Sequence, residues 1–187
     1  MDIICNFKSG IILKNKIVLA EGDNESHTPI LEELGIADDY LGATKKFVRV
    51  ELVPKDREWW VDPKDHPEHW RFVVDQDVVP DWFDRTEKEK EFRLAVCEWW
   101  DKHVLVDQKI DTLETGYFML KRCEVKKLCN DVKVMLDRST VNEMWDSSTV
   151  NKMRDSSTAR NFKKYPKIEI LVPDDQSKFT MVFHKNE

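Results

Sequence analysis

The sequence contains few glycines, and none of them are clustered. Its 187 residues include five glycines, at positions 10, 22, 35, 42 and 116. A phosphate-binding loop of the G-x-x-x-x-G-K-[ST] or G-x-G-x-x-G type needs at least two glycines within a few residues of each other, in a fixed pattern. The observed spacing excludes both patterns, and with them the usual sequence signature of a nucleotide-binding protein.

Cysteine pairs and long apolar runs are also missing. The four cysteines, at positions 5, 97, 123 and 129, form no C-x-x-C pair, which favours a reduced compartment. No apolar run approaches the roughly 18 residues of a membrane span. A secretory signal needs an unbroken apolar segment, but the first 20 residues carry Asp2, Lys8, Lys14 and Lys16. We therefore expect a soluble, cytoplasmic protein with no membrane partner.

The charges are unevenly distributed along the chain. Residues 1–115 contain 16 Lys and Arg against 26 Asp and Glu, whereas residues 116–187 contain 14 against 10. A solvated surface of uneven charge explains this most simply. An acidic front half repels phosphate backbones and disfavours nucleic acid as a partner. Because 41% of the residues are apolar, the chain can still form a core, as one domain or as a domain with an appended module.

Residues 1–115 are expected to form a small acidic α/β module within an α+β protein. Residues 11–19 contain two β-rich runs around a Lys-Asn-Lys turn, which predicts a hairpin. Thr28 as cap and Gly35 as a left-handed stop predict a short helix between them. Alternating apolar and charged residues predict a half-buried strand over 47–53, and a second strand is expected over 70–74.

A longer helix is predicted from Arg85 to Val104. Asp84 and Glu87 make a capping-box start. The apolar face predicted for this helix consists of Phe92, Ala95, Val96, Trp99, Trp100, His103 and Val104.

A nine-residue repeat is the strongest pattern in the chain. It runs through residues 137–163 as three copies around Ser-Thr-Val or Ser-Thr-Ala. Neither an α-helix nor an unbroken strand keeps residues nine apart on one face. The chain must therefore bend once per repeat, and Asp-Ser-Ser can make such a bend without glycine. The recurring apolar positions are Val141, Val150 and Ala159, together with Met144, Met153 and Phe162.

The repeat predicts that residues 116–187 form a short β-solenoid, with two nine-residue units in each eighteen-residue coil. Short helical turns are the main alternative, because Asp-Ser-Ser-Thr is also a good helix N-cap sequence. Repeat-type calcium binding is not expected, because the G-G-x-G-x-D pattern is missing. Residues 167–172 and 178–183 are expected to form a closing hairpin that covers the last coil.

The sequence resembles a family of small uncharacterised proteins from phages and gut bacteria. The resemblance is carried by Phe47-Val48-Arg49-Val50-Glu51, by the run from Trp70 to Asp77 that continues to Pro80-Asp81-Trp82-Phe83-Asp84, and by the Ser-Ser-Thr-Val nonapeptides. It implies an α/β front part followed by a variable number of repeats. It also implies a mobile-element setting, in which small acidic proteins often bind and block a host component. The family has no established activity, so the resemblance assigns no catalytic residues.

Two groups of residues in the front half are candidates for a site. Asp75, Asp77 and Asp81 are clustered near Trp82, and such carboxylates can act as an acid–base pair or hold a divalent ion. Turn formation is the simpler explanation for them. The Trp59-Trp60 pair opens a charged loop, where burying both rings is difficult. An exposed aromatic side chain with acidic neighbours is a typical interface anchor.

Histidines give little reason to expect a metal. His66 and His69 lie three residues apart, but Pro67 interrupts any helix and no third ligand has a typical spacing. His27 is expected to lie beside a helix start, and His103 on an apolar helix face. We therefore expect neither a metal nor another cofactor.

These observations favour a non-catalytic protein that binds and inhibits or modulates a host or phage protein. The proposed binding residues are Trp59, Trp60, Asp75, Asp77, Asp81 and Trp82. The repeats would stiffen, space or dimerise the molecule. A small acid–base or metal-dependent hydrolase using Asp75, Asp77 and Asp81 is an alternative, and a DNA mimic is another.

Overall fold

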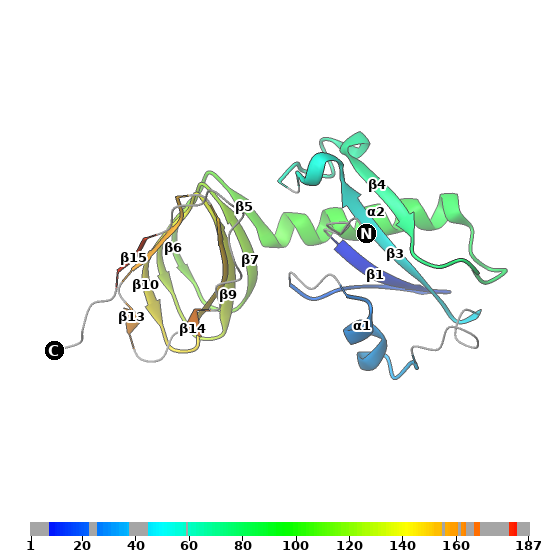
Figure 1. Ribbon diagram of the computed structural model, residues 1–187, viewed down its shortest axis with the longest axis horizontal. Helices are drawn as coiled ribbons and strands as arrows, with labels where there is room; N and C mark the ends of the chain where they lie inside the picture. Colours follow the sequence, from blue (N-terminus) through cyan, green and yellow to red (C-terminus); the bar gives the residue numbers. More distant parts are fainter. Residues whose placement is uncertain are drawn as a thin grey trace. The chain divides into compact units, whose positions relative to one another are not determined.

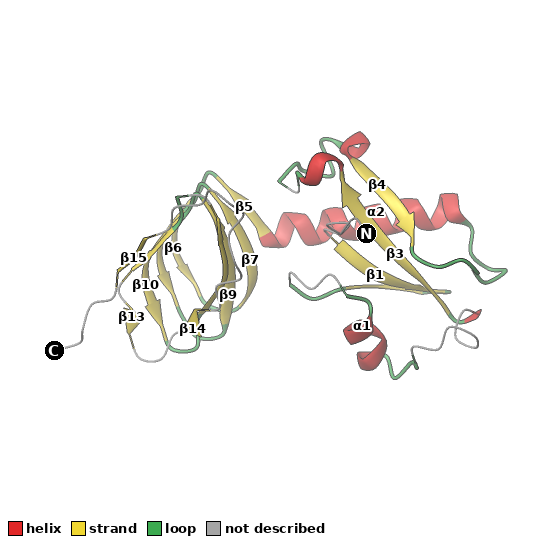
Figure 2. Cartoon of the chain, viewed as in Figure 1, coloured by secondary structure: helices red, strands yellow, loops and turns green. Residues whose placement is uncertain are grey.

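The computed structural model describes residues 8–22, 26–37, 45–58, 60–154, 156–160, 162–163, 167–168 and 180–182. The chain divides into two compact units, residues 1–100 and 101–187. The first is mixed α and β, and the second is a β-solenoid (Figures 1 and 2). The expected boundary between residues 115 and 116 is therefore displaced, because strands before it already pair as part of the solenoid.

An antiparallel sheet forms the centre of the first unit. Its strands are β1 (Lys8–Leu13), β2 (Lys16–Leu19), β3 (Phe47–Pro54) and β4 (Trp70–Val74), in the order β2-β1-β3-β4. The hairpin predicted over residues 11–19 is confirmed by the pairing of β1 with β2. Two 3₁₀ turns, Lys55–Arg57 and Pro67–His69, lie in the connection between β3 and β4.

Helix α2 (Arg85–His103) covers one face of this sheet, as Figure 1 shows behind the strands. Helix α2 and the sheet approach so closely at Gly10 that a Cβ atom on this residue would lie 2.5 Å from Cε2 of Phe92. Phe92 also packs against Phe72, with ring centroids 5.7 Å apart. The predicted cap is present, since the Glu87 amide donates to Oδ1 of Asp84 at 3.0 Å.

Helix α1 (Thr28–Glu33) packs on β1 over the other face, in a core that includes Ile11, Leu31 and Phe47. Its N-cap is His27, not the expected Thr28. Gly35 ends the helix with a φ of 62°, as expected for a left-handed stop.

Strand β3 differs from the half-buried strand that its sequence predicts. All eight of its residues are buried, including Arg49 and Glu51. Strand β3 is central in the sheet, with α1 over one face and α2 over the other. The side chains of Arg49 and Glu51 therefore point toward the face that α1 covers. Their burial gives the first unit a polar interior that the alternating pattern does not reveal.

Two parallel sheets form the solenoid. One contains β5 (Val104–Val106), β7 (Gly116–Lys121), β9 (Val132–Asp137), β11 (Thr149–Arg154) and β14 (Lys167–Ile168). The other contains β6 (Lys109–Leu113), β8 (Glu124–Leu128), β10 (Thr140–Trp145), β12 (Thr158–Arg160) and β15 (Thr180–Val182), with β13 (Phe162–Lys163) also paired to β10. The repeat residues 140–145, 149–154 and 158–160 are strands, so the alternative of short helical turns is wrong for them.

Apolar side chains from both sheets fill the interior of the solenoid. The strand register places Val141 beside Ala159, a step of 18 residues, but Val125 beside Val141, a step of 16, and Ile110 beside Val125, a step of 15. An eighteen-residue coil therefore describes the last part only. The buried core includes Leu120, Val125, Leu128, Val134, Leu136, Val141, Met144, Val150, Met153 and Ala159.

The bends between the sheets use residues other than glycine. Asp107, Arg122 and Arg138 have positive φ at one corner, and Asn130 and Asp146 at the opposite corner. Asn and Asp tolerate this conformation better than most residues do. The Asp-Ser-Ser sequence at 146–148 thus contains a bend, as the repeat predicts.

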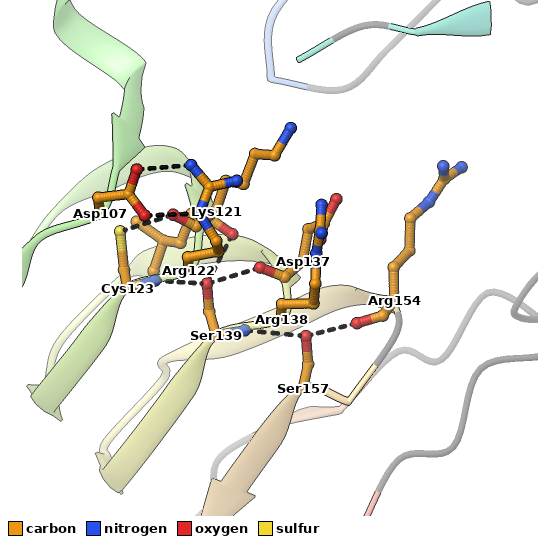
Figure 3. A network of polar contacts seen from close by, with 10 residues as sticks. Asp107, Lys121, Arg122, Cys123, Asp137, Arg138, Ser139, Arg154 and Ser157 are labelled. Atoms are coloured by element: carbon orange, nitrogen blue, oxygen red, sulfur yellow. Dashed lines mark hydrogen bonds and ion pairs between the residues drawn. The ribbon is translucent and has the colours of Figure 1, made fainter.

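A column of buried polar side chains connects successive coils at the first corner (Figure 3). The Cys123 amide donates to Oγ of Ser139 at 3.0 Å, and the Ser139 amide donates to Oγ of Ser157 at 3.3 Å. The Ser157 hydroxyl donates to the Arg154 carbonyl oxygen at 2.6 Å. Each of these side chains satisfies backbone groups that the bend leaves outside the strand ladders.

The closing hairpin expected from residues 167–172 and 178–183 is wrong for the part that the structure describes. Strand β14 pairs in parallel with β11, whereas β15 pairs in parallel with β12, so the two segments extend different sheets. Each segment thus adds a strand to the edge of its sheet, where unpaired backbone groups accept it. Among the helices of the described residues, none combines the length and apolar character needed to cross a bilayer.

Candidate functional site

The segment from Asp75 to Trp82, called here the acidic loop, follows β4 and is tied to β3. The Asp75 amide donates to the Arg49 carbonyl oxygen at 2.9 Å. Oε1 of Gln76 accepts from the Arg49 amide at 2.9 Å, and Nε2 of Gln76 lies 2.7 Å from the Val78 carbonyl oxygen. The Gln76 side chain thus continues the pairing of β3 after β4 has ended, which holds the start of the acidic loop in place.

The far end of the acidic loop is also held. The indole N–H of Trp82 donates to the Lys45 carbonyl oxygen at 3.2 Å, and the Phe83 amide donates to the Pro80 carbonyl oxygen at 2.9 Å. Trp82 is half-buried and Pro80 is buried. Trp82 therefore anchors the acidic loop to the chain before β3 and presents only part of its ring to solvent.

The tip of the acidic loop exposes apolar side chains. Val78 is 61% exposed and Val79 is 41% exposed. Asp77 and Asp81, on either side of this pair, are exposed as well. The described residues contain one other large apolar side chain as exposed as these, Leu94 on α2. An apolar tip with acidic flanks is thus localised at one loop, and neither valine was identified from the sequence.

Of the two adjacent tryptophans, the structure describes Trp60, which lies away from the acidic loop. Trp59 lies outside the described residues. Trp60 is half-buried with its indole nitrogen buried, in the segment that precedes β4. That segment is held at the start of β4, where the Trp70 indole N–H donates to the Val61 carbonyl oxygen at 3.0 Å. Trp60 and the acidic loop lie at opposite ends of β4, about 16 Å of strand apart.

Within the described residues, the three clustered aspartates do not form one group of ligand atoms. Asp75 meets His27 and Glu51, whose ligand atoms and its own all lie within 4.8 Å of one another. Asp77 and Asp81 belong to no such group of three within the described parts of the chain. Sequence spacing could not find His27 and Glu51, because they come from the start of α1 and from the middle of β3. The only hint was the presence of charged residues in a strand that proves to be central.

The histidines at 66 and 69 have separate partners. Nδ1 of His66 lies 3.4 Å from Oε1 of Glu68, and Nε2 of His69 lies 2.8 Å from the Glu58 carbonyl oxygen. A backbone hydrogen bond lowers the pKa of the Glu68 carboxyl, and the neighbouring His66 side chain lowers it further. His103, predicted to be a core histidine, is half-buried and lies 2.8 Å from the Tyr117 carbonyl oxygen through Nδ1.

On the solenoid, polar side chains serve structure. A surface hollow of about 370 Å³ is lined by residues whose charges are paired, with Nζ of Lys126 lying 3.1 Å from Oδ1 of Asp111. Arg122 donates two hydrogen bonds to Asp107, each 2.5 Å long, and thereby lowers the pKa of that carboxyl. Burial raises the pKa of the Cys123 thiol, which disfavours the thiolate that nucleophilic chemistry needs.

Comparison with known protein families, with curated proteins and with solved structures gives no match to this chain. The acidic loop and the group formed by His27, Glu51 and Asp75 are the two outstanding features of the described residues.

Proposed function

We propose that the protein is a non-catalytic binding protein and that the acidic loop is its partner-binding surface. The partner is a protein with a small apolar pocket and basic side chains around it. The observation that carries this proposal is the exposure of Val78 and Val79 on a loop that is fixed at both ends. The resemblance of the sequence to phage and gut-bacterial proteins supports a host component as that partner.

The fixed ends of the loop favour binding, because they reduce the conformational entropy that the loop would lose on binding. An exposed valine costs free energy in water, and burying one side chain fully contributes roughly 1.5 kcal/mol or more. A flexible loop loses part of that gain as entropy when it is ordered on binding. Gln76 and Trp82 already restrain this loop, so the free energy gained by burying Val78 and Val79 is mostly retained.

The charge of the first unit supports the basic character of the partner. Residues 1–100 contain 22 Asp and Glu against 14 Lys and Arg. Asp77 and Asp81 stand beside the apolar tip and are exposed. Rim charges of this kind steer the encounter with an oppositely charged surface and set its salt dependence.

The nine-residue spacing is proposed as the half-coil unit of the last part of the solenoid. Val141 and Val150 belong to strands of opposite sheets, β10 and β11, and each pairs with a residue 18 positions later, Ala159 and Ile168. In this arrangement the repeats supply a stiff support that can be lengthened one coil at a time.

Site-specific photocrosslinking tests the binding function. A photoreactive residue at position 78 is expected to crosslink one protein from the natural host, whereas the same residue at position 94 is not. Leu94 is the matched control because it is equally exposed, at 62%, but lies on α2 outside the acidic loop.

Affinity for the crosslinked protein then decides the role of the loop. Val78→Ser and Val79→Ser together are expected to weaken binding about tenfold or more, and Asp77→Asn is expected mainly to slow association. Equal crosslinking from positions 78 and 94, or unchanged affinity of the double valine variant, would contradict the proposal.

A further inference from the structure

The group formed by His27, Glu51 and Asp75 lies on the sheet face that α1 covers. Glu51 lies on β3, two residues from Arg49, so both side chains point to the same face. Asp75 lies directly opposite Arg49, because its amide donates to the Arg49 carbonyl oxygen. Asp75 and Glu51 are therefore diagonal neighbours on one face. His27, the N-cap of α1, completes the group from the helix side.

The donor atoms are close enough to share one ion. One nitrogen of His27 and one oxygen from each carboxylate all lie within 4.8 Å of one another, and Nδ1 of His27 is 3.6 Å from Oδ2 of Asp75. Zinc binds nitrogen and oxygen ligands at about 2.0–2.2 Å. Tetrahedral ligands at that radius lie roughly 3.3–3.6 Å apart, so side-chain adjustments of about 1 Å bring all three donors into range.

The hydrogen bonding of His27 orients the nitrogen that faces the carboxylates. Nε2 of His27 lies 3.1 Å from the Val50 carbonyl oxygen. A carbonyl oxygen only accepts, so Nε2 carries a proton, and in the neutral imidazole Nδ1 presents a lone pair toward Asp75. Histidines that ligate metals usually donate their other N–H to a backbone carbonyl or a carboxylate in this way. A lone pair facing a carboxylate is repulsive unless a cation or a proton lies between them.

Burial and charge also favour a cation here. His27 is 8% exposed and Glu51 is 5% exposed, whereas the Asp75 side chain is 56% exposed and leaves a path from solvent. The buried Arg49 is a positive group on the same face, with its guanidinium 4.9 Å from the centre of the Phe47 ring. Glu51 is a buried carboxylate, and buried charges in proteins are paired or coordinate metal ions.

We infer that His27, Glu51 and Asp75 form a site for a divalent transition-metal ion, with Zn²⁺ the ion that fits best. Nδ1 of His27 and one oxygen of each carboxylate are the protein ligands, and water occupies the remaining coordination position on the exposed side of Asp75. One nitrogen with two carboxylate oxygens suits Zn²⁺ or Mn²⁺ better than a soft ion that prefers sulfur ligands. The sequence analysis expected no metal, because no set of three ligands was apparent from the spacing of the residues.

Titration with Zn²⁺ alone tests the site, with Co²⁺ as a spectroscopic substitute. We expect one Zn²⁺ per chain and an increase in melting temperature on binding. Asp75→Asn is expected to weaken Zn²⁺ affinity at least tenfold, and because Asp75 is exposed this variant should fold. Asp77→Asn is the matched control, as a neighbouring exposed carboxylate outside the group. His66→Gln with His69→Gln is the control for the exposed histidine pair, and both controls should bind Zn²⁺ as the wild type does.

A second measurement reads His27 directly. Zn²⁺ is expected to shift the ring resonances of His27 in the NMR spectrum of the wild type, and His27→Gln is expected to remove the visible absorption of bound Co²⁺. The inference is overturned if millimolar Zn²⁺ does not bind, if Asp75→Asn binds it as tightly as the wild type, or if the His66 and His69 variant loses it. A protonated Nδ1 of His27 that persists in the presence of Zn²⁺ would equally overturn it, and would identify an imidazolium ion paired with Asp75.

Discussion

Residues 1–100 and 101–187 bury different kinds of polar side chain. In the first unit the described buried polar side chains are mostly charged or titratable and include Lys8, His27, Arg49 and Glu51. In the solenoid they are mostly hydroxyls, such as Ser139, Ser148 and Ser157. Asp137 is the charged exception in the solenoid, and its carboxylate accepts a hydrogen bond from Arg138 at 2.8 Å.

This difference distinguishes buried polar side chains that support the fold from the buried charged side chains of the first unit. The buried hydroxyls of Ser139 and Ser157 bond to backbone groups of their own and neighbouring coils, and this arrangement recurs from one coil to the next. A buried charge is costly and must be compensated individually. Such groups occur together in the first unit, which is also the acidic one, with 22 acidic and 14 basic residues against 14 and 16 in residues 101–187. We therefore place both candidate sites in the first unit.

Removing repeats from the solenoid is expected to have the largest effect on stability. Deleting residues 140–157 takes out eighteen residues and joins Ser139 to Thr158, the register partner of Thr140. Deleting residues 140–148 moves every later strand to the opposite sheet. We expect the nine-residue deletion to melt about 5 °C or more below the eighteen-residue deletion, because each coil contacts only its neighbours.

Thermal unfolding followed by circular dichroism measures this difference. If the nine-residue deletion variant has a melting temperature equal to or higher than that of the eighteen-residue variant, each nine-residue unit does not belong to a fixed sheet of the solenoid.

A single buried charge in the first unit is expected to have the next largest effect. Nζ of Lys8 donates to the carbonyl oxygens of Ala20 at 2.6 Å and Gly22 at 3.2 Å and lies 3.7 Å from the centre of a Trp99 ring. Lys8→Ala leaves buried carbonyl groups and a cavity, which we expect to cost about 3 kcal/mol or more. Urea unfolding followed by tryptophan fluorescence gives the value.

The control for Lys8 is Lys14→Ala, in the exposed turn between β1 and β2. This variant should stay within about 0.5 kcal/mol of the wild type. A Lys8→Ala variant as stable as its control would mean that charge burial does not distinguish the two units.

A hydroxyl of the solenoid is expected to matter less. Oγ of Ser139 accepts from the Cys123 amide and lies 2.9 Å from the carbonyl oxygens of Leu120 and Asp137. Ser139→Ala should cost about 1–2 kcal/mol in urea unfolding, since one backbone donor loses its partner and the side chain loses its own donated bond. Ser139→Cys should cost less, because Cys123 already occupies the same place in the preceding coil, with Sγ 3.2 Å from the Leu105 carbonyl oxygen. Equal losses for the two variants would argue that packing, not hydrogen bonding, maintains this column.

Local patterns predicted the elements of the chain well where the signal lies within one segment. The hairpin at 11–19, the strand at 70–74 and the helix capped by Asp84 each depend on neighbouring residues, and each is present. The solenoid follows from the repeat for the same reason, because every unit carries its own bend and its own apolar positions. Boundaries were less accurate. Strands β5 and β6 precede residue 116 and were not expected in the solenoid, because they pair with the next coil at a step of 15 residues and show no strict repeat.

The candidate site was only partly accessible from the sequence. Asp75, Asp77, Asp81 and Trp82 lie in or beside one loop, but Trp60 lies at the other end of β4. The strand predicted over 70–74 lies between these two segments, and five extended residues place them at its opposite ends. His27 was expected to be only a neighbour of a helix cap, and its contact with Asp75 joins residues 48 positions apart.

The sequence by itself determined that the second unit is a repeating β structure, because each short segment of the repeat carries its own bend and its own apolar residues. It also determined the acidic character of the first unit. The tertiary structure alone decided that Arg49 and Glu51 are buried, that Val78 and Val79 are exposed, and that His27, Glu51 and Asp75 meet. These outcomes depend on which strand is central and on what covers each face of the sheet, and contacts between residues distant in the sequence fix both.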